Sequence, residues 1–427
     1  MKKMMKTLLT AAIVGTVLTA AGSVAMAEEE PVTVTWFASR PVDGAIDLAI
    51  REIAKQYSDE HGGNWQLEVI TEADRPSYLQ KLQTLVSGGN MPDIIDIDAT
   101  PYCQELVDAG MLVDVKEYLN EEGLYDSFEP TALAYQEFTN GTMYTLPLEY
   151  HVEMIWYNKE IFAENGLEVP TTMDEWLNVC QALSEAGITP IAVDGVDRWP
   201  VIRYLAMMPF RETGNEYIIS LSEGNASMGD ETGRNGIEFF QQIGQYFQEG
   251  FAATDYATAQ AMFLDGQAAM YYIGDWEIAA MQEGYENGTI GYFYMPAVEG
   301  AYTQANEFCV NSGIGMAFNS ETFDEKTKDF INYVIENYGK IYAGMDQMTP
   351  IKSELPEDHE FSELYLQVRE DMSNIGEHFL KPWDCYLDSN TCNVVNDNAL
   401  LLATGDMDAD TFIELVDSAL AEYTSGF

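Results

Sequence analysis

The stretch that decides the fold is YTLPLEYHVEMIWYNK, residues 144–159, which follows the turn signal Asn140-Gly141. The run is long for a single strand, since most strands in globular proteins are shorter. A strand of this length can pass from one domain into another. The chain of 427 residues is long enough for two or three domains with cores of their own. We therefore expect residues 144–159 to connect two domains.

Strand and helix patterns alternate on both sides of this stretch. Before it, we expect strands at 32–37, 65–70 and 91–98 and helices at 46–57, 78–86 and 101–109. After it, we expect strands at 188–193, 268–273, 290–295 and 314–318, helices at 234–248, 258–264 and 325–338, and mostly helix from Ser362 on. This rhythm predicts an α/β fold in which each domain has a mainly parallel sheet flanked by helices.

The composition is that of a globular, strongly acidic protein. Hydrophobic residues make up 47% and aromatic residues 12% of the chain. Lys and Arg total 20 against 71 Asp and Glu, which gives a net charge of −51. Such a charge argues against nucleic acid and anionic membranes as partners, because both need a basic surface. The acids are spread along the whole chain, which predicts a solvated outer surface.

The amino terminus has the pattern of a secretory signal peptide. Lys2, Lys3 and Lys6 precede an uncharged run, and Ala25-Met26-Ala27 forms an A-x-A cleavage site before three glutamates. An uncleaved membrane anchor is the alternative. No cysteine lies near the site for lipid attachment, and no later stretch is long and apolar enough to span a bilayer. We expect an exported protein, periplasmic or extracellular, with residues 1–27 removed.

The five cysteines cannot all pair within one chain. Cys180 falls on the apolar face of a predicted helix, which indicates a buried residue. Cys385 and Cys392 could close a short loop as a disulfide or remain free. No C-x-x-C pair is present, which excludes a zinc ribbon or a thioredoxin motif.

Six motifs in order resemble the bacterial extracellular solute-binding proteins of family 1, the carbohydrate type that includes maltose-binding protein. They are TWFASRP (35–41), LVSGGNMPDIIDID (85–98), YTLPLEYHVEMIWYNKEIF (144–162), GLEVPTTMDEW (166–176), FLDGQAAMYYIGDW (263–276) and NSGIGMAF (311–318). One departure is Met173, where the family usually has Trp. Each motif alone is weak, but six in the same order over most of the chain are specific.

The resemblance implies a two-lobe periplasmic-binding-protein fold of type II with three chain crossings. We expect these crossings near residues 149–154, 295–296 and 335–341. The lobes would then comprise 28–149 with 297–337, and 150–296 with 338–427. The solute would bind between the lobes, which close around it by a hinge motion that the permease subunits of an ABC importer recognise. We expect a monomer with no cofactor, no metal and no catalytic residue.

A sugar needs aromatic platforms for its C–H faces and polar groups for its hydroxyls. Trp276 follows Asp275 at the end of a predicted strand, and the resemblance places a sugar-stacking Trp there. The other candidates lie at strand ends, in loops or at the first crossing, where a side chain can face the cleft: Trp199, Glu149, Asp98, Arg40, Asp43, Tyr150, His151, Asp197, Arg203 and Trp383 with its neighbour Asp384. Asp96 is the alternative to Asp98, and Trp36 is expected to be structural.

Two other functions fit parts of the sequence. Acids beside Trp and Tyr also form cages for a cationic amine such as a polyamine. Two carboxylates flanking a sugar are what a glycoside hydrolase needs, although 71 acids make such pairs common by chance. Asp406, Asp408 and Asp410 mimic the start of a calcium loop but lack its glycine and final glutamate, so an acidic helix start is preferred. No metalloprotease, hydrolase or phosphate-loop motif occurs.

Overall fold

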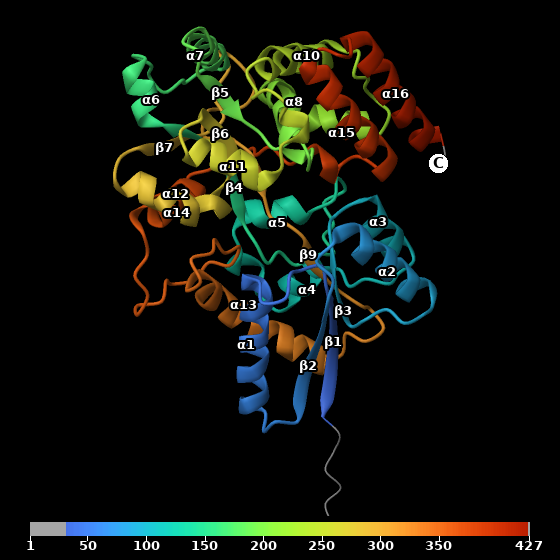
Figure 1. The fold of residues 1–427 in the computed structure, drawn as a ribbon. Helices are drawn as coiled ribbons and strands as arrows, with labels where there is room; N and C mark the ends of the chain where they lie inside the picture. Colours follow the sequence, from blue (N-terminus) through green and yellow to red (C-terminus); the bar gives the residue numbers. More distant parts are fainter. Residues whose placement is uncertain (1–30, 426–427) are drawn as a thin grey trace, which may run out of the picture.

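The computed structural model describes residues 31–425, so the predicted signal peptide lies outside the described residues. Two sheets organise the chain, and we call the parts built on them the first and the second lobe (Figure 1). The first lobe contains β1 (Val32–Ala38), α1 (Ala45–Glu60), β2 (Trp65–Thr71), α2 (Arg75–Ser87), β3 (Ile94–Ile97), α3 (Pro101–Asp108), α4 (Val115–Glu121), η1 (Tyr125–Ser127), α5 (Pro130–Gln136), β9 (Gly315–Phe318) and α13 (Glu325–Ala343).

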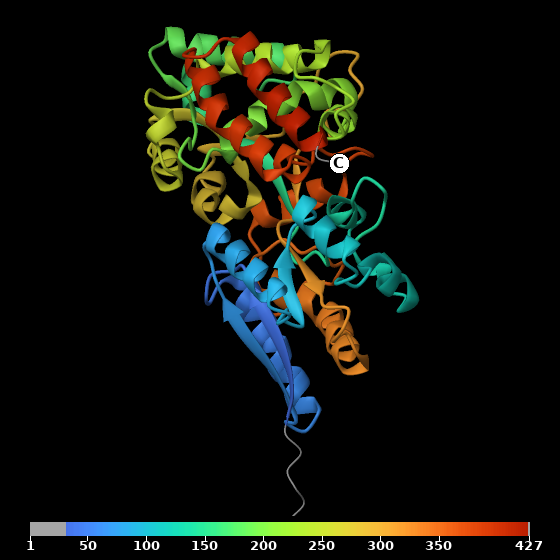
Figure 2. The same ribbon diagram turned by 90° about the vertical axis from the view of Figure 1, so that its right-hand side faces the viewer.

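The second lobe holds the remaining elements. They are β4 (His151–Asn158), α6 (Lys159–Glu164), α7 (Met173–Glu185), β5 (Thr189–Ala192), α8 (Trp199–Thr213), α9 (Glu216–Ser222), α10 (Glu231–Gly244), η2 (Phe251–Ala253), α11 (Tyr256–Leu264), β6 (Ala268–Gly274), η3 (Asp275–Glu277), α12 (Ile278–Glu286), β7 (Ile290–Phe293), β8 (Val310–Asn311), α14 (Glu363–Ser373), η4 (Trp383–Cys385), α15 (Ser389–Thr404) and α16 (Ala409–Ser425). Figure 2 shows α15 and α16, in red, lying together on the outside of this lobe.

The first-lobe sheet has a hydrophobic layer on each face because its side chains alternate. Val34 and Trp36 of β1 pack in the layer that contains α1 and α13. Phe37 points the other way and stacks on Tyr78 of α2, with ring centroids 4.4 Å apart. In the second lobe, the predicted capping box begins α7, where the Thr172 hydroxyl accepts from the Glu175 N–H at 3.2 Å.

Except for β4 and β9, which begin at chain crossings, the strands of both lobes run toward the space between the lobes and end there. The first sheet has the order β2-β1-β3-β9, in which only β9 is antiparallel to its neighbour. In the second sheet, β4 lies antiparallel between β6 and β7. The prediction of mainly parallel pairing is therefore wrong for the second sheet. The physical reason is that β4 starts where the chain enters this lobe and runs outward from the cleft. Its neighbours β6 and β7 run toward the cleft, so both pairings are antiparallel.

The chain crosses between the sheets in two adjacent segments. On the first crossing, Leu146 still bridges Met316 of the first sheet, whereas His151 pairs with Asn311 of β8. On the second crossing, the chain leaves β8 after Asn311 and joins the first sheet at Gly315. The predicted second crossing at 295–296 is therefore too early, because Ala297 bridges Thr172 of the second lobe.

Buried Arg211 explains why residues 297–311 stay with the second lobe. Its Nε donates to the Pro296 carbonyl at 2.9 Å, and its Nη1 donates to the Glu307 carbonyl at 2.7 Å and to the Thr303 hydroxyl at 3.1 Å. These bonds tie both ends of the segment to α8. Five donors on one rigid group make Arg suited to this task.

The third crossing also lies later than predicted. Helix α13 continues to Ala343 within the first lobe, because Tyr338 and Tyr342 are buried in its core. The Tyr338 hydroxyl donates to the Leu148 carbonyl at 2.7 Å. Met348 packs in the second-lobe core, but Ile351 is still in the first-lobe core and bridges Phe128, so the passage follows the helix and does not fall within it at 335–341.

All five cysteines are free in the described structure, including Cys385 and Cys392. Cys180 is fully buried, as its helical pattern predicts. None of the helices in residues 31–425 combines the length and apolar character needed to cross a membrane. Asp408 accepts from the Thr411 N–H at 2.9 Å, which is the predicted acidic start of a helix.

Candidate ligand-binding site

A cavity of about 370 Å³ opens where the strand ends of the second lobe meet the first two crossings. We call it the crossing cavity. Trp276 follows β6 in η3, Trp199 and Arg203 lie at the start of α8, and Asp384 belongs to η4. Glu149 and His151 come from the first crossing, and Asn311 and Gly313 from the second. The cavity is within the size range of small-molecule sites.

Trp276 is held in place by its neighbours. Its Nε1 donates to the Tyr256 hydroxyl at 2.8 Å, which leaves the rest of the indole available as an apolar surface. The preceding Gly274 permits this position, since a Cβ there would stand 2.1 Å from the indole ring. The Trp276 and Trp199 rings lie 6.0 Å apart at 61°. Two half-buried tryptophans at this angle form a corner that can hold an apolar molecular face.

A chain of buried charges runs beneath the cavity from one lobe to the other. Arg40 bonds Asp96 through Nε at 3.0 Å, and its two Nη atoms donate to the Glu149 carboxylate and the Ile314 carbonyl. Asp96 also accepts from Trp36 Nε1 and from the Ser39 N–H, each at 2.9 Å. The loop after β1 is thereby fixed to both of the first two crossings.

The charge chain continues into the second lobe through His151. Its Nε2 lies 3.4 Å from Glu149 Oε2, and its Nδ1 lies 3.2 Å from Asp275 Oδ2. The other oxygen of Asp275 accepts from the Val152 N–H at 2.7 Å. Gly313 makes room for this arrangement, because a Cβ there would stand 2.3 Å from Cδ of Glu149.

The pKa values follow from these contacts. Burial opposes the charge on His151, but Asp275 and Glu149 outweigh it and raise its pKa to about 10. Burial also opposes the charge on Glu149, but Arg40 and His151 lower its pKa to about 2. Both side chains are therefore charged at neutral pH.

A second buried ion cluster includes two lining residues of the cavity, Arg203 and Asp384. Arg203 Nε lies 3.2 Å from both oxygens of Glu153, and its Nη1 donates to Asp384 at 3.0 Å. Tyr272 donates to Glu153 at 2.8 Å. The guanidinium also lies over the Trp199 ring, 5.1 Å from its centroid. Arg203 thus fixes both an aromatic and an acidic lining residue.

Five of the predicted site residues line the crossing cavity: Trp276, Trp199, Glu149, His151 and Arg203. The structure places the other predicted residues elsewhere. Arg40 is 6% exposed, and its guanidinium is paired with Asp96. Asp275 is buried and paired with His151. Trp383 is a core residue of the second lobe, because its ring packs toward Tyr217 while its neighbour Asp384 faces the cavity.

Three more predicted residues lie away from the crossing cavity. Asp98 pairs with Arg75 of α2. Asp43 is exposed in a tight turn, where its N–H donates to Asp47 at 3.2 Å. Asp197 is exposed before α8, and its N–H donates to Asp194 at 3.1 Å. An ion pair therefore accounts for the Asp98 side chain, whereas the side chains of Asp43 and Asp197 are exposed outside the crossing cavity.

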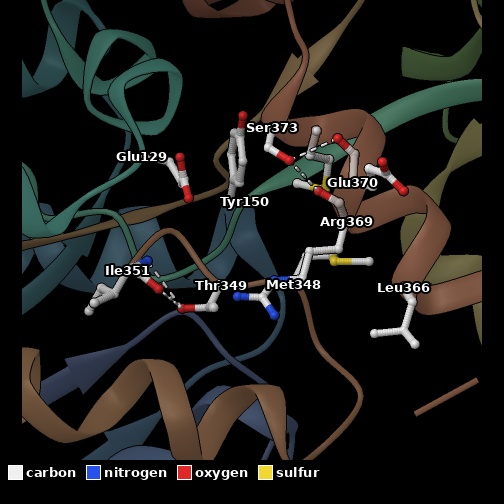
Figure 3. Close-up of a pocket in the computed structure, with 10 residues that line it drawn as sticks. Glu129, Tyr150, Met348, Thr349, Ile351, Leu366, Arg369, Glu370 and Ser373 are labelled. Atoms are coloured by element: carbon white, nitrogen blue, oxygen red, sulfur yellow. Dashed lines mark hydrogen bonds between the residues drawn. The ribbon is translucent and has the colours of Figure 1, made fainter. Parts of the chain in front are cut away.

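Tyr150 faces a different cavity, of about 350 Å³, beside α14 and the third crossing (Figure 3). Its ring stands between Glu129 and Ser373 in this view, and its hydroxyl contacts Thr131. Successive residues of an extended chain point to opposite sides, so Tyr150 cannot share the cavity of Glu149. The structure therefore places Tyr150 in a different cavity from Glu149 and His151.

Sequence reasoning missed Asn311 and Gly313. Both belong to the second crossing, which was expected at 295–296. The signal was present in the NSGIGMAF motif, whose first residues are polar and small. Residues 31–425 contain no group of three or more His, Cys, Asp or Glu arranged to hold a metal ion.

The family model for bacterial extracellular solute-binding proteins matches residues 44–340. The chain belongs to this family. The match runs from the loop after β1 through most of α13, and so includes both of the adjacent crossings and most of the cavity residues.

Individual relatives are distant. The chain is 25% identical over 279 residues to the multiple sugar-binding protein of Streptococcus mutans, covering 63% of each chain. It is 24% identical over 284 residues to a probable sugar-binding periplasmic protein of Rhizobium meliloti, covering 65% of this chain and 64% of that one. The matched regions thus span less than two thirds of these relatives.

Solved structures agree with the fold over nearly the whole chain. A chitin oligosaccharide binding protein superposes with a TM-score of 0.76 at 22% identity, covering 93% of this chain and 100% of that one. RafE from Streptococcus pneumoniae gives 0.69 at 21% identity, covering 93% and 99%. At these identities the likeness establishes the two-lobe fold.

Proposed function

We propose that this family member captures a sugar or oligosaccharide in the crossing cavity and delivers it to the permease subunits of an ABC importer. One observation carries the proposal. Trp199 and Trp276 form an aromatic corner beside the polar groups of Glu149, Asn311 and Asp384. Aromatic faces suit the C–H surface of a sugar ring, and the carboxylates and amide suit its hydroxyls. The sugar-binding relatives support the same ligand class.

The position of the cavity supports a closing motion. Its lining combines residues of the second lobe with residues of the two crossings, so a bound solute contacts the segments that bend when the lobes move. A ligand that contacts the closed form better than the open form shifts the balance toward closure. The closed form is then the one presented to the importer. We propose that the protein acts as an exported monomer.

The pairing of charges favours a neutral ring over a cationic amine in this cavity. Glu149 is compensated by Arg40 and His151, and Asp384 by Arg203. An amine site needs acids whose charge is not already balanced. Each of the two lining acids already contacts a cation, so a polyamine gains less there than it would beside unpaired acids.

Binding without turnover is also what these groups support. A glycosidase needs a protonated carboxylic acid as a proton donor at working pH. Glu149 has a pKa of about 2 and is ionised throughout the neutral range. Asp384 is engaged by Arg203. We propose that neither carboxylate transfers a proton to a glycosidic oxygen.

A thermal-shift screen over mono- and oligosaccharides tests the proposal, followed by calorimetry on the best ligand. A ligand at 100 times its dissociation constant adds about 2.7 kcal/mol of stability. We expect at least one sugar to stabilise the protein, spermidine to have no effect, and no new reducing ends to form. Stabilisation by spermidine alone, or release of reducing sugar, would overturn the proposal.

A further inference from the structure

A second, smaller cavity of about 180 Å³ lies between the lobes on the other side of η4. Asp384 lines the crossing cavity, and the next residue, Cys385, lines the second one. From the first lobe, the second cavity receives Thr100 and Phe138. From the second lobe it receives Lys381 and Tyr386. The two cavities therefore lie on either side of η4, and an oligosaccharide that passes η4 would reach both.

Lys381 is the unusual residue of this second cavity. It is 4% exposed, and its Nζ donates to the Glu137 carbonyl at 3.2 Å. Among residues 31–425, no carboxylate oxygen lies within 4.0 Å of this ammonium group. The two carboxylates that act on it from a greater distance are engaged elsewhere, because Glu137 pairs with Lys116 at 2.6 Å and Asp98 pairs with Arg75.

Two tyrosine rings flank the ammonium group. The Nζ lies 5.1 Å from the ring centroid of Tyr135, which belongs to the first lobe. It lies 5.4 Å from that of Tyr386, which lines the cavity. Aromatic faces attract a cation but do not neutralise it. Burial lowers the pKa of Lys381, which shows that its surroundings repay only part of the lost hydration.

Lys381 is a buried cation that has no ionic partner and lies beside an open cavity. An anionic group of a ligand could supply the missing partner. We propose that the second cavity is a subsite for an anionic sugar unit, whose carboxylate or sulfate pairs with Lys381. The Tyr386 ring supplies the platform on which that unit stacks. This inference rests on the proposed function and narrows its substrate class to acidic oligosaccharides, with a neutral ring in the crossing cavity.

The strongly negative surface does not prevent such a ligand from binding. At physiological ionic strength, the field of exposed charges is screened over about 8 Å. Lys381 acts at contact distance in a buried site, where screening by salt is weak. The surface charge slows the approach of an anionic ligand, and Lys381 acts on the bound state.

The test compares matched ligands that differ in charge. One pair is glucuronosyl-xylotriose and its methyl ester, and the other is a sulfated galactobiose and galactobiose, so that each anionic ligand carries one charged unit. Calorimetry is done on the full mature chain at about 0.15 M salt, the physiological value. We expect the anionic member of one pair to bind at least ten times more tightly than its neutral partner. The pair that shows the difference identifies the anion as carboxylate or sulfate.

Variants then assign the effect to the residue. In Lys381→Met the preference for the anionic member is lost while the neutral member binds as before, and Lys381→Arg retains the preference. Lys55→Met, on the exposed face of α1, is the control and changes neither. Equal binding of both members overturns the inference but leaves the proposed function standing. If Lys381→Met weakens binding of the anionic and the neutral member equally, the inference is also overturned and the proposed function stands. The lysine would then serve only as a contact between the lobes. Failure of every sugar to bind overturns both proposals.

Discussion

The imidazole Nδ1 of His151 lies 3.2 Å from the Oδ2 of Asp275, which joins the first crossing to the end of β6. Because Glu149 contacts the other ring nitrogen, His151 is held between two carboxylates. Trp276 follows Asp275 directly, and its ring meets that of His151 edge-on at 5.5 Å. The charge chain and the aromatic corner are therefore one unit, so a change in either is expected to alter the other.

The first prediction concerns pH. His151 has a folded-state pKa of about 10, raised from the usual value of 6.5. Its stabilising effect is fully present below pH 6.5 and is lost as the pH rises through about 10. His151→Gln should cost roughly 3 kcal/mol at pH 6, since it leaves buried carboxylates with one partner fewer. The cost should shrink steadily toward pH 10. Urea unfolding at pH 6, 8 and 10 measures it.

His61→Gln serves as the control for this series. His61 is exposed at the end of α1, 3.6 Å from a carboxylate of Asp329 that is itself exposed. We expect only a small change in unfolding free energy at any of the three pH values. A cost of His151→Gln that does not vary with pH would mean that the histidine is neutral in the folded protein.

The second prediction concerns the aromatic corner. Trp276→Ala removes the indole that faces the cavity and should weaken sugar binding by about 2 kcal/mol or more, a factor of roughly thirty. Calorimetry with the best sugar of the screen measures the dissociation constant. Tyr302→Ala is the control, because Tyr302 is 56% exposed and stacks near His378, away from both interlobe cavities. Wild-type affinity in Trp276→Ala would exclude the crossing cavity as the site.

The third prediction concerns Gly313, which has a φ of +57° and lies against Glu149. Gly313→Ala should displace the Glu149 carboxylate and reduce both stability and sugar affinity, with a backbone cost of about 1–3 kcal/mol. Gly288→Ala separates the two effects, because Gly288 has a φ of +83° but no atom within 4 Å of the point where a Cβ would stand. It should lose stability without losing affinity. Equal affinity losses in both variants would contradict this role of Gly313.

The fourth prediction compares two arginines, one within α8 and one at its N-cap. Arg203→Met leaves Glu153 buried without a cation beside it and should destabilise the protein by about 3–5 kcal/mol. Arg198→Met removes an exposed pair with Asp397 and should cost less than about 1 kcal/mol. Chemical denaturation of both variants measures the difference. Similar costs would show that the Glu153 cluster is open to water.

The fifth prediction concerns the thiols. All five cysteines are free, and burial raises the pKa of Cys385 and of Cys392 to about 12. In the folded protein these two thiols should therefore react slowly with iodoacetamide at pH 8. After denaturation without reductant, mass spectrometry should count five alkylated cysteines. A count of two fewer would reveal a disulfide.

The order of elements followed from local patterns, and so did several details. The capping box at Thr172, the buried Cys180 and the structural place of Trp36 all depend on residues close in sequence or on one periodic face. The positions of crossings did not follow so well. The end of the second-lobe segment depends on Arg211, whose partners Pro296, Thr303 and Glu307 lie far ahead in the chain. No local pattern announces a bond of that separation.

The candidate site divides in the same way. Trp276, Glu149 and His151 could be found because strand ends and a chain crossing are visible in the sequence and face a cleft in this fold. Asp98, Asp43 and Asp197 have the same local appearance. They differ in where the fold places their side chains: Asp98 is paired with Arg75, and Asp43 and Asp197 are exposed away from the cavity.

The sequence by itself determined the family, the two-lobe α/β architecture and the chemistry that a ligand would meet. It could do so because periodicity and motif order are properties of the chain alone. The tertiary structure decided which charged groups are already neutralised and which remain for a ligand. The difference between Arg40, which is paired twice, and Lys381, which meets no carboxylate among the described residues, arises from contacts between segments far apart in the chain. Electrostatic pairing acts through space over a few ångströms, so only the folded arrangement could settle it.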